Sequence, residues 1–175
     1  MLSTSRVKSH VILIGYRGVG KTTIGQLLGA RLQCPFRDSD TEIVNDTGLS
    51  IPQIFKEHGE DYFRRIEQQV IQRLCQVSDP IILSTGGGAV LSSVNRELMK
   101  KYGTIVLLKA SEDIIFQRIH EDLNRPPLTS HDLKKEIREV LKIRNPLYQG
   151  IKDLAIDTES YSPNDAVTAI LEYIH

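Results

Sequence analysis

An apolar run at residues 11–14 leads directly into the segment Gly15-Tyr16-Arg17-Gly18-Val19-Gly20-Lys21-Thr22. An amphipathic stretch follows as far as residue 32, so the segment lies between an expected strand and an expected helix. This is the spacing and setting of the phosphate-binding loop G-x-x-x-x-G-K-[S/T], or P-loop. Its glycines let successive backbone N–H groups face phosphate oxygens, and the helix N-terminus adds positive charge. A glycine-rich turn that binds nothing is the alternative, and the complete motif disfavours it.

In a P-loop, Lys21 reaches the β- and γ-phosphates and the Thr22 hydroxyl can bind Mg²⁺. The motif alone does not distinguish a kinase from a GTPase, an ATPase or a transporter motor. The chain has no Asn-Lys-x-Asp segment to recognise guanine, and it is too short for a motor with accessory machinery. A small kinase that binds a nucleoside triphosphate is therefore predicted.

The chain has 175 residues, which predicts one domain covering residues 1–175, with a flexible stretch at 1–9. Its 22 basic residues balance 22 acidic ones, so nothing indicates nucleic acid or a membrane surface as a partner. No stretch approaches the roughly 18–20 apolar residues of a membrane span. We expect a cytoplasmic monomer that acts on small molecules. Cys34 and Cys75 lack the spacing of a metal site or a disulfide framework, so buried thiols are expected.

Short β-rich runs alternate with longer amphipathic stretches along the chain, which predicts a three-layer α/β fold. Five parallel strands with helices on both faces are expected, at residues 11–14, 35–37, 81–84, 105–108 and 154–156. Helices are expected at 21–32, 50–58, 60–77, 94–102, 111–122 and 132–144, with a last one from Ser162 and Pro163. Gly59 and Gly103 are expected to end helices. The polar, proline-bearing segment 123–131 is interpreted as a mobile lid, and about 39–67 as substrate-binding helices.

Two further segments follow expected strands and should lie beside the P-loop. Asp38-Ser39-Asp40 follows the second strand, and Gly86-Gly87-Gly88 follows the third. One carboxylate there can hold Mg²⁺ through water, and the other can face an acceptor hydroxyl. Capping of a helix by the same residues is an open alternative. The three glycines would let a ligand approach the backbone closely, and a plain flexible turn is the alternative.

Three arginines are candidates for binding an anionic ligand. Arg64 lies on an expected helix, where a solvated helix face is the usual role of an arginine. Arg125 lies on the proline-bearing lid segment, from which it could close over phosphates and neutralise developing charge. Arg144 lies near an expected helix end, where interaction with the helix dipole is an equal possibility.

Together these motifs resemble the shikimate kinase family in order and spacing, from about residue 10 to residue 174. They are the P-loop, Asp38-x-Asp40, Phe63-Arg64-x-x-Glu67, Gly86-Gly87-Gly88, Arg125-Pro126 and Arg144-x-Pro146-Leu147-Tyr148. On the donor side, the resemblance implies that the ATP phosphates are held by Gly18, Val19, Gly20, Lys21, Thr22 and Thr23. It also implies that Thr22 binds Mg²⁺, with Asp38 supporting the metal through water. Arg125 would reach the phosphates, and Arg118 and Pro163 would enclose the adenine.

On the acceptor side, the resemblance implies that Asp40 binds the hydroxyls of shikimate and lies nearest the attacking one, as orienting group or base. Arg64 and Arg144 would clamp the shikimate carboxylate, a task that suits planar guanidinium groups. The backbone of Gly86-Gly87-Gly88 would contact the same ring.

The activity implied by the resemblance is transfer of the ATP γ-phosphoryl group to the 3-hydroxyl of shikimate, in the pathway to chorismate and the aromatic amino acids. Lys21, Asp40 and Arg125 would be its catalytic residues. A kinase for another polyol, such as gluconate, is one alternative, and the two clamp arginines and the three glycines weigh against it. A non-catalytic relative that binds a nucleotide or a partner protein is another, and the presence of every catalytic residue weighs against it.

Overall fold

A computed structural model describes residues 9–120 and 130–175 of the chain. Its sheet has five parallel strands in the order β2-β3-β1-β4-β5. The strands are β1 His10–Ile14, β2 Phe36–Asp38, β3 Ile82–Ser84, β4 Gly103–Lys109 and β5 Leu154–Asp157. Each lies within about two residues of its predicted position, and the predicted parallel α/β sheet is confirmed.

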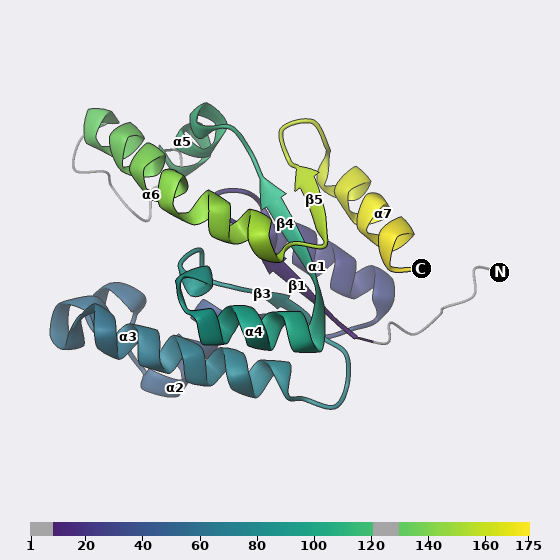
Figure 1. Ribbon diagram of the computed structural model, residues 1–175, viewed down its shortest axis with the longest axis horizontal. Helices are drawn as coiled ribbons and strands as arrows, with labels where there is room; N and C mark the ends of the chain where they lie inside the picture. Colours follow the sequence, from purple (N-terminus) through teal and green to yellow (C-terminus); the bar gives the residue numbers. More distant parts are fainter. Residues whose placement is uncertain (1–8, 121–129) are drawn as a thin grey trace.

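Helices cover both faces of the sheet (Figure 1). They are α1 Lys21–Leu32, α2 Ser39–Thr47, α3 Ile51–Cys75, α4 Ser93–Tyr102, α5 Glu112–His120, α6 Ser130–Ile151 and α7 Pro163–Ile174, with a 3₁₀ turn η1 at Ala89–Leu91. Along β1, Val11 and Leu13 belong to the core beneath α1, α5 and α7, whereas Ile12 and Ile14 belong to the core beneath α3 and α4. The strand is apolar throughout because both of its faces are buried.

Local sequence signals account for the shape of α3. Ser50 and Gln53 form the predicted reciprocal capping box at its start. Gly59 has φ 81° and ψ 176°, which is not helical, so α3 consists of two helical segments with a break between them. The predicted break at Gly59 is confirmed. Gly103 follows the end of α4 as predicted, but in an extended conformation, because it is already the first residue of β4.

The prediction that the sixth helix ends near Arg144 is wrong. Helix α6 continues through Pro146 to Ile151. Its first half contributes Leu133, Ile137 and Leu141 to one core, and its second half contributes Tyr148 and Ile151 to the other. Proline removes one helical hydrogen bond, but burying two large side chains stabilises by about 1.5–3 kcal/mol each. The second core therefore extends the helix past its proline.

Two further expectations concern membrane spans and the cysteines. No helix within residues 9–120 and 130–175 is long and apolar enough to cross a membrane.

Cys75 is buried, as predicted, and burial raises the pKa of its thiol to about 11, so it stays protonated at neutral pH. Cys34 is only half-buried. The predicted lid at 123–131 falls largely outside the described residues.

Candidate active site

The segments that follow β1, β2 and β3 meet at one edge of the sheet. The strands are neighbours in the order β2-β3-β1 and run parallel, so their carboxyl ends coincide. A pocket of about 380 Å³ lies there, and a second of about 750 Å³ extends from it between α1 and α2. The residues shared by the linings of both pockets are Arg17, Gly18, Thr22, Asp38 and Asp40. The prediction that Asp38 and Asp40 lie beside the P-loop is confirmed.

The P-loop has a backbone that only glycine adopts readily. Gly15 has φ 138°, and a side chain there would collide with the Leu108 carbonyl of β4. Gly20 has φ 90° and precedes α1 without any side-chain cap. The first N–H groups of α1 are therefore not claimed by a capping side chain, and they add to the positive end of the helix dipole. This is a cradle for an anion.

Lys21 is folded back into this loop. Its ammonium donates to the carbonyl oxygens of Gly15 and Tyr16, both at 2.8 Å. Burial lowers the pKa of Lys21 to about 8, and the nearby carboxylates of Asp40 and Asp38 oppose this only in part. The charged ammonium is thus poorly compensated, and a phosphate in the cradle would favour it.

Asp38 is the last residue of β2 and caps the N-terminus of α2. One carboxylate oxygen, Oδ1, accepts from the backbone N–H of Asp40 at 3.0 Å and of Thr41 at 3.3 Å. Helix capping, the open alternative for this segment, is therefore correct for Asp38. A capping carboxylate still offers its second oxygen, so capping and metal support are compatible.

The donor groups beside the cradle suit a magnesium ion. The Thr22 hydroxyl and the Asp38 carboxylate line the same two pockets. Mg²⁺ takes one or two such protein oxygens and completes its shell with water and phosphate oxygens. No cluster of three or more His, Cys, Asp or Glu residues that could hold a metal exists in the part of the chain that the structure describes. The residues present thus fit a metal ion that is bound together with nucleotide phosphates.

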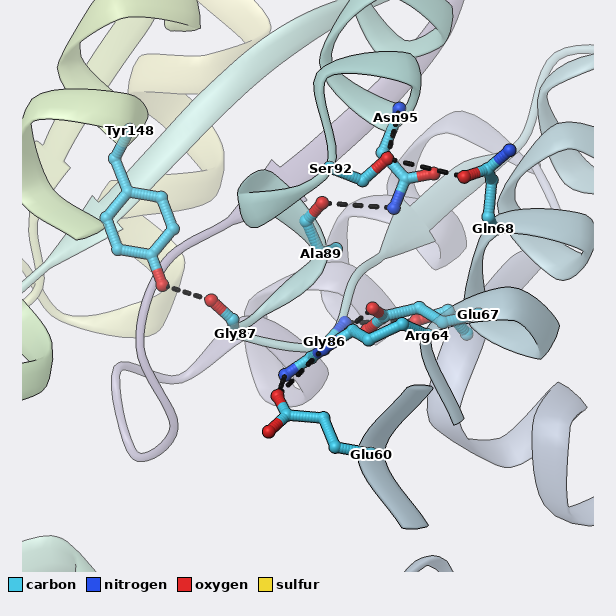
Figure 2. Close-up of polar contacts among 11 residues, drawn as sticks. Glu60, Arg64, Glu67, Gln68, Gly86, Gly87, Ala89, Ser92, Asn95 and Tyr148 are labelled. Carbon is cyan, nitrogen blue, oxygen red and sulfur yellow. Dashed lines mark hydrogen bonds and ion pairs between the residues drawn. The ribbon is translucent and has the colours of Figure 1, made fainter. Parts of the chain in front are cut away.

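Arg64 projects from α3 onto the glycine segment 86–88 (Figure 2). Glu67 accepts from its Nη1 at 2.7 Å, and Glu60 accepts from its Nη2 at 3.2 Å. A Cβ added at Gly88 would lie only 2.5 Å from the Arg64 Nη2. The side chain is 24% exposed, so Arg64 is not on the solvated face of its helix. Glycine at position 88 leaves the space that this guanidinium occupies.

Glu67 positions Arg64, a role that the sequence analysis did not assign to it. It is 1% exposed, and burial raises the pKa of its carboxyl while Arg64 lowers it. A Cβ at Gly86 would lie 2.9 Å from the Glu67 Oε1 and 2.8 Å from the Asp40 Oδ1. The Glu67 carboxylate therefore fixes Arg64 on one side and abuts Gly86 on the other. An acidic residue three positions after a helical arginine was the available signal.

Arg144 reaches the opposite side of the glycine segment from α6. A Cβ at Gly87 would lie 3.4 Å from its Nη1. Because α6 continues to Ile151, Arg144 lies in mid-helix, and the suggested interaction with a helix end is wrong. Arg64 and Arg144 thus approach neighbouring glycines from different helices, as a clamp for a carboxylate requires.

Arg118 connects the P-loop to the loop after β5. Its Nη1 donates to the Gly18 carbonyl at 3.2 Å and to the Thr158 hydroxyl at 2.9 Å, and its Nη2 donates to the Thr158 carbonyl at 2.8 Å. Pro163 is the first residue of α7, directly after this loop. Arg118 therefore lies at one end of the phosphate cradle. Arg125 falls outside the described residues.

Comparisons with known proteins decide the family. A model of the family described as shikimate kinase matches residues 17–175. The chain belongs to the shikimate kinase family. Shikimate kinases of Thioalkalivibrio sulfidiphilus and Pseudomonas fluorescens are 43% and 44% identical to it, over 94% and 93% of this chain and 86% and 94% of theirs. It is accordingly a kinase, an ATP-using enzyme.

Solved structures agree with this assignment. The shikimate kinase of Acinetobacter baumannii in complex with shikimate has a TM-score of 0.89 and 37% identity, covering 97% of this chain and 94% of that one. The enzyme of Aquifex aeolicus has a TM-score of 0.78 and 32% identity, covering 94% and 95%. A gluconokinase of Sinorhizobium meliloti, at 18% identity and a TM-score of 0.65, shares the fold alone.

Replacing Gly88 by alanine is expected to weaken shikimate binding without unfolding the protein. Gly88 has φ −92°, which alanine tolerates, but the new Cβ would displace the Arg64 guanidinium. We expect the shikimate KM to rise about tenfold, as for loss of one charge-assisted hydrogen bond, with the thermal midpoint nearly unchanged. Gly150→Ala on α6 is the control, because a Cβ there meets nothing within 4 Å. An unchanged shikimate KM in Gly88→Ala would contradict the packing argument.

Nucleotide affinity should fall as the pH rises through the pKa of Lys21. The free protein loses the ammonium proton near pH 8, whereas bound phosphate favours the protonated form and raises this pKa. ADP binding should therefore take up a proton and weaken about tenfold between pH 7 and pH 9. Titration calorimetry in buffers of different ionisation enthalpy measures both quantities. Lys21→Arg, which stays charged, should flatten the profile; an equally flat profile for the unmodified protein would rule out the assignment.

Proposed function

We propose that this protein transfers the γ-phosphoryl group of ATP to the 3-hydroxyl of shikimate, giving shikimate 3-phosphate for the synthesis of chorismate and the aromatic amino acids. Membership of the shikimate kinase family supports the reaction. The observation that carries it is the meeting of two half-sites. A phosphate cradle lies against a glycine segment that Arg64 and Arg144 approach from two helices.

For the donor, we assign the ATP phosphates to the cradle of residues 18–23. Its first-turn N–H groups and Lys21 would face the phosphate oxygens. Arg118 would stack on one face of the adenine and Pro163 on the other. The donors of Arg118 are bound to Gly18 and Thr158, which holds its planar group at the end of the cradle. Arg125 would approach the phosphates from the lid.

For the acceptor, we assign the shikimate carboxylate to Arg64 and Arg144. Two guanidinium groups at one glycine segment suit a single carboxylate, because each offers paired N–H donors. Asp40 would bind the ring hydroxyls and orient the one that attacks. The Gly86-Gly87-Gly88 backbone would lie against the ring.

Mg²⁺ is the proposed metal, with Thr22 and Asp38 as the residues that would hold it. When bound, it supplies charge neutralisation on the β- and γ-phosphate oxygens. Lys21 supplies a further positive charge from within the loop, and it exchanges its two carbonyl partners for phosphate oxygens. Most of the rate enhancement then comes from aligning the acceptor hydroxyl with the phosphorus, since a loose transition state needs little from a base.

Three other properties stay predictions. We expect the protein to act in the cytoplasm, as a monomer, and without nucleic acid or membrane partners. The equal numbers of basic and acidic residues support the absence of a polyanionic partner.

A panel of acceptors tests the function. Coupled measurement of ADP release should show turnover with shikimate and none with gluconate or other polyols, because only shikimate combines a carboxylate with correctly placed ring hydroxyls. Turnover with gluconate but not shikimate would overturn the proposal in favour of another polyol kinase. ATP binding without release of ADP from any acceptor would indicate a non-catalytic relative.

Arginine variants test the assigned roles. Arg144→Ala should raise the shikimate KM by about 10- to 100-fold, as expected for a charged hydrogen-bonding partner, with the ATP KM unchanged. Arg125→Ala should mainly lower kcat, because that residue is assigned to the developing charge. Arg138→Ala is the control for Arg144, since Arg138 is on the same helix and 72% exposed. Unaltered shikimate affinity in Arg144→Ala would disprove the clamp.

A further inference from the structure

Tyr148 joins helix α6 to the glycine segment. Tyr148 is 2% exposed, and its hydroxyl donates to the carbonyl of Gly87, 61 positions away in the sequence, at 2.5 Å. Figure 2 shows the ring pointing from α6 directly at Gly87. Tyr148 follows Arg144 by four positions, so both side chains leave the same face of α6. One helix face thus presents a carboxylate-binding cation and a hydroxyl to one glycine.

The hydroxyl is suited to act as a permanent donor. Burial raises the pKa of Tyr148 to about 12, and the nearby Arg144 guanidinium opposes this only in part. The proton therefore stays on the phenol at any physiological pH, and the hydroxyl can always donate a hydrogen bond to the Gly87 carbonyl.

Gly87 lies where the two half-sites touch. A Cβ there would be 3.4 Å from the Gly15 carbonyl oxygen and 3.6 Å from the Arg17 nitrogen, both in the P-loop, and 3.4 Å from the Arg144 Nη1. Three glycines in succession have more backbone freedom than any other tripeptide, so their orientation must be imposed from outside. Ser39 fixes one end, since its hydroxyl accepts from the Gly86 N–H at 2.9 Å. Tyr148 fixes the middle.

The orientation of the Gly87 carbonyl also determines the direction of the Gly88 N–H. The Gly87 carbonyl and the Gly88 N–H belong to one planar trans peptide, so they point in opposite directions. With the carbonyl held toward α6, the Gly88 N–H points away from α6. Arg64 and Glu67 lie on that other side of the segment (Figure 2).

We propose that Tyr148 is a positioning residue of the acceptor site: its hydroxyl holds the glycine segment in the orientation that receives the acceptor between Arg64 and Arg144. The inference rests on the proposed function in taking shikimate as the acceptor. Tyr148 does not touch the reacting atoms. It acts through the Gly87 peptide, so its loss should affect the acceptor and spare ATP.

Tyr148→Phe removes one oxygen atom and keeps the buried ring. We expect the shikimate KM to rise about tenfold, because a buried carbonyl loses its partner and the segment loses its anchor, while the ATP KM stays within about twofold. Tyr102→Phe is the matched control, since it removes a phenol hydroxyl from a ring that packs on the same core. An unchanged shikimate KM, or an equal rise of both KM values with a lower thermal midpoint, would overturn the inference.

Backbone amide exchange across residues 86–89 provides a readout that does not depend on the substrate. Exchange there should be faster in Tyr148→Phe than in the unmodified protein or in Tyr102→Phe, and unchanged rates would also overturn the inference. If the unmodified protein releases no ADP with shikimate, the proposed function fails, whereas the exchange experiment still decides whether Tyr148 holds the segment.

Discussion

The common edge of β2, β3 and β1 is the constraint on which the whole candidate site depends. Three segments of different sequence meet there only because these strands are parallel neighbours. The central strand β1 is buried on both faces and paired on both sides, which fixes the position of the P-loop that follows it. Close approach then requires glycine at the contact points. Gly15 abuts the Leu108 carbonyl, and Gly87 abuts the P-loop.

The cationic side chains that are expected to bind substrate anions are bound to groups of the protein itself. Lys21 donates to two loop carbonyls, and Arg64 is held by Glu60 and Glu67. Burial lowers the pKa of Lys21 to about 8, and the carboxylates of Asp40 and Asp38 oppose this only in part. The arginine is held by carboxylates and is already positioned before an acceptor arrives. The proposed donor half-site thus keeps a charge that phosphate can satisfy, and the proposed acceptor half-site keeps a fixed geometry.

Helix α6 connects these requirements to the hydrophobic core. It packs on both cores, and between those two contacts it carries Arg144 toward the glycine segment. Tyr148 then belongs to the core through its ring and to the site through its hydroxyl. The acceptor half-site is therefore as rigid as the packing that supports it, which is how a site on loops can hold a ligand in one orientation.

The sequence by itself determined the parts of this protein that local pattern controls. The P-loop, the five strands, the break at Gly59 and the capping box were predicted because each depends on residues close together in the chain. Motifs spread from about residue 10 to 174 also identified the family, which the comparisons confirm. Only the tertiary structure decided that α6 runs past Pro146, because burial of Tyr148 and Ile151 in a distant core outweighs a local helix breaker. It likewise decided that Arg64 lies against Gly88 and that Tyr148 reaches Gly87, since such contacts arise from packing between segments and leave no local pattern.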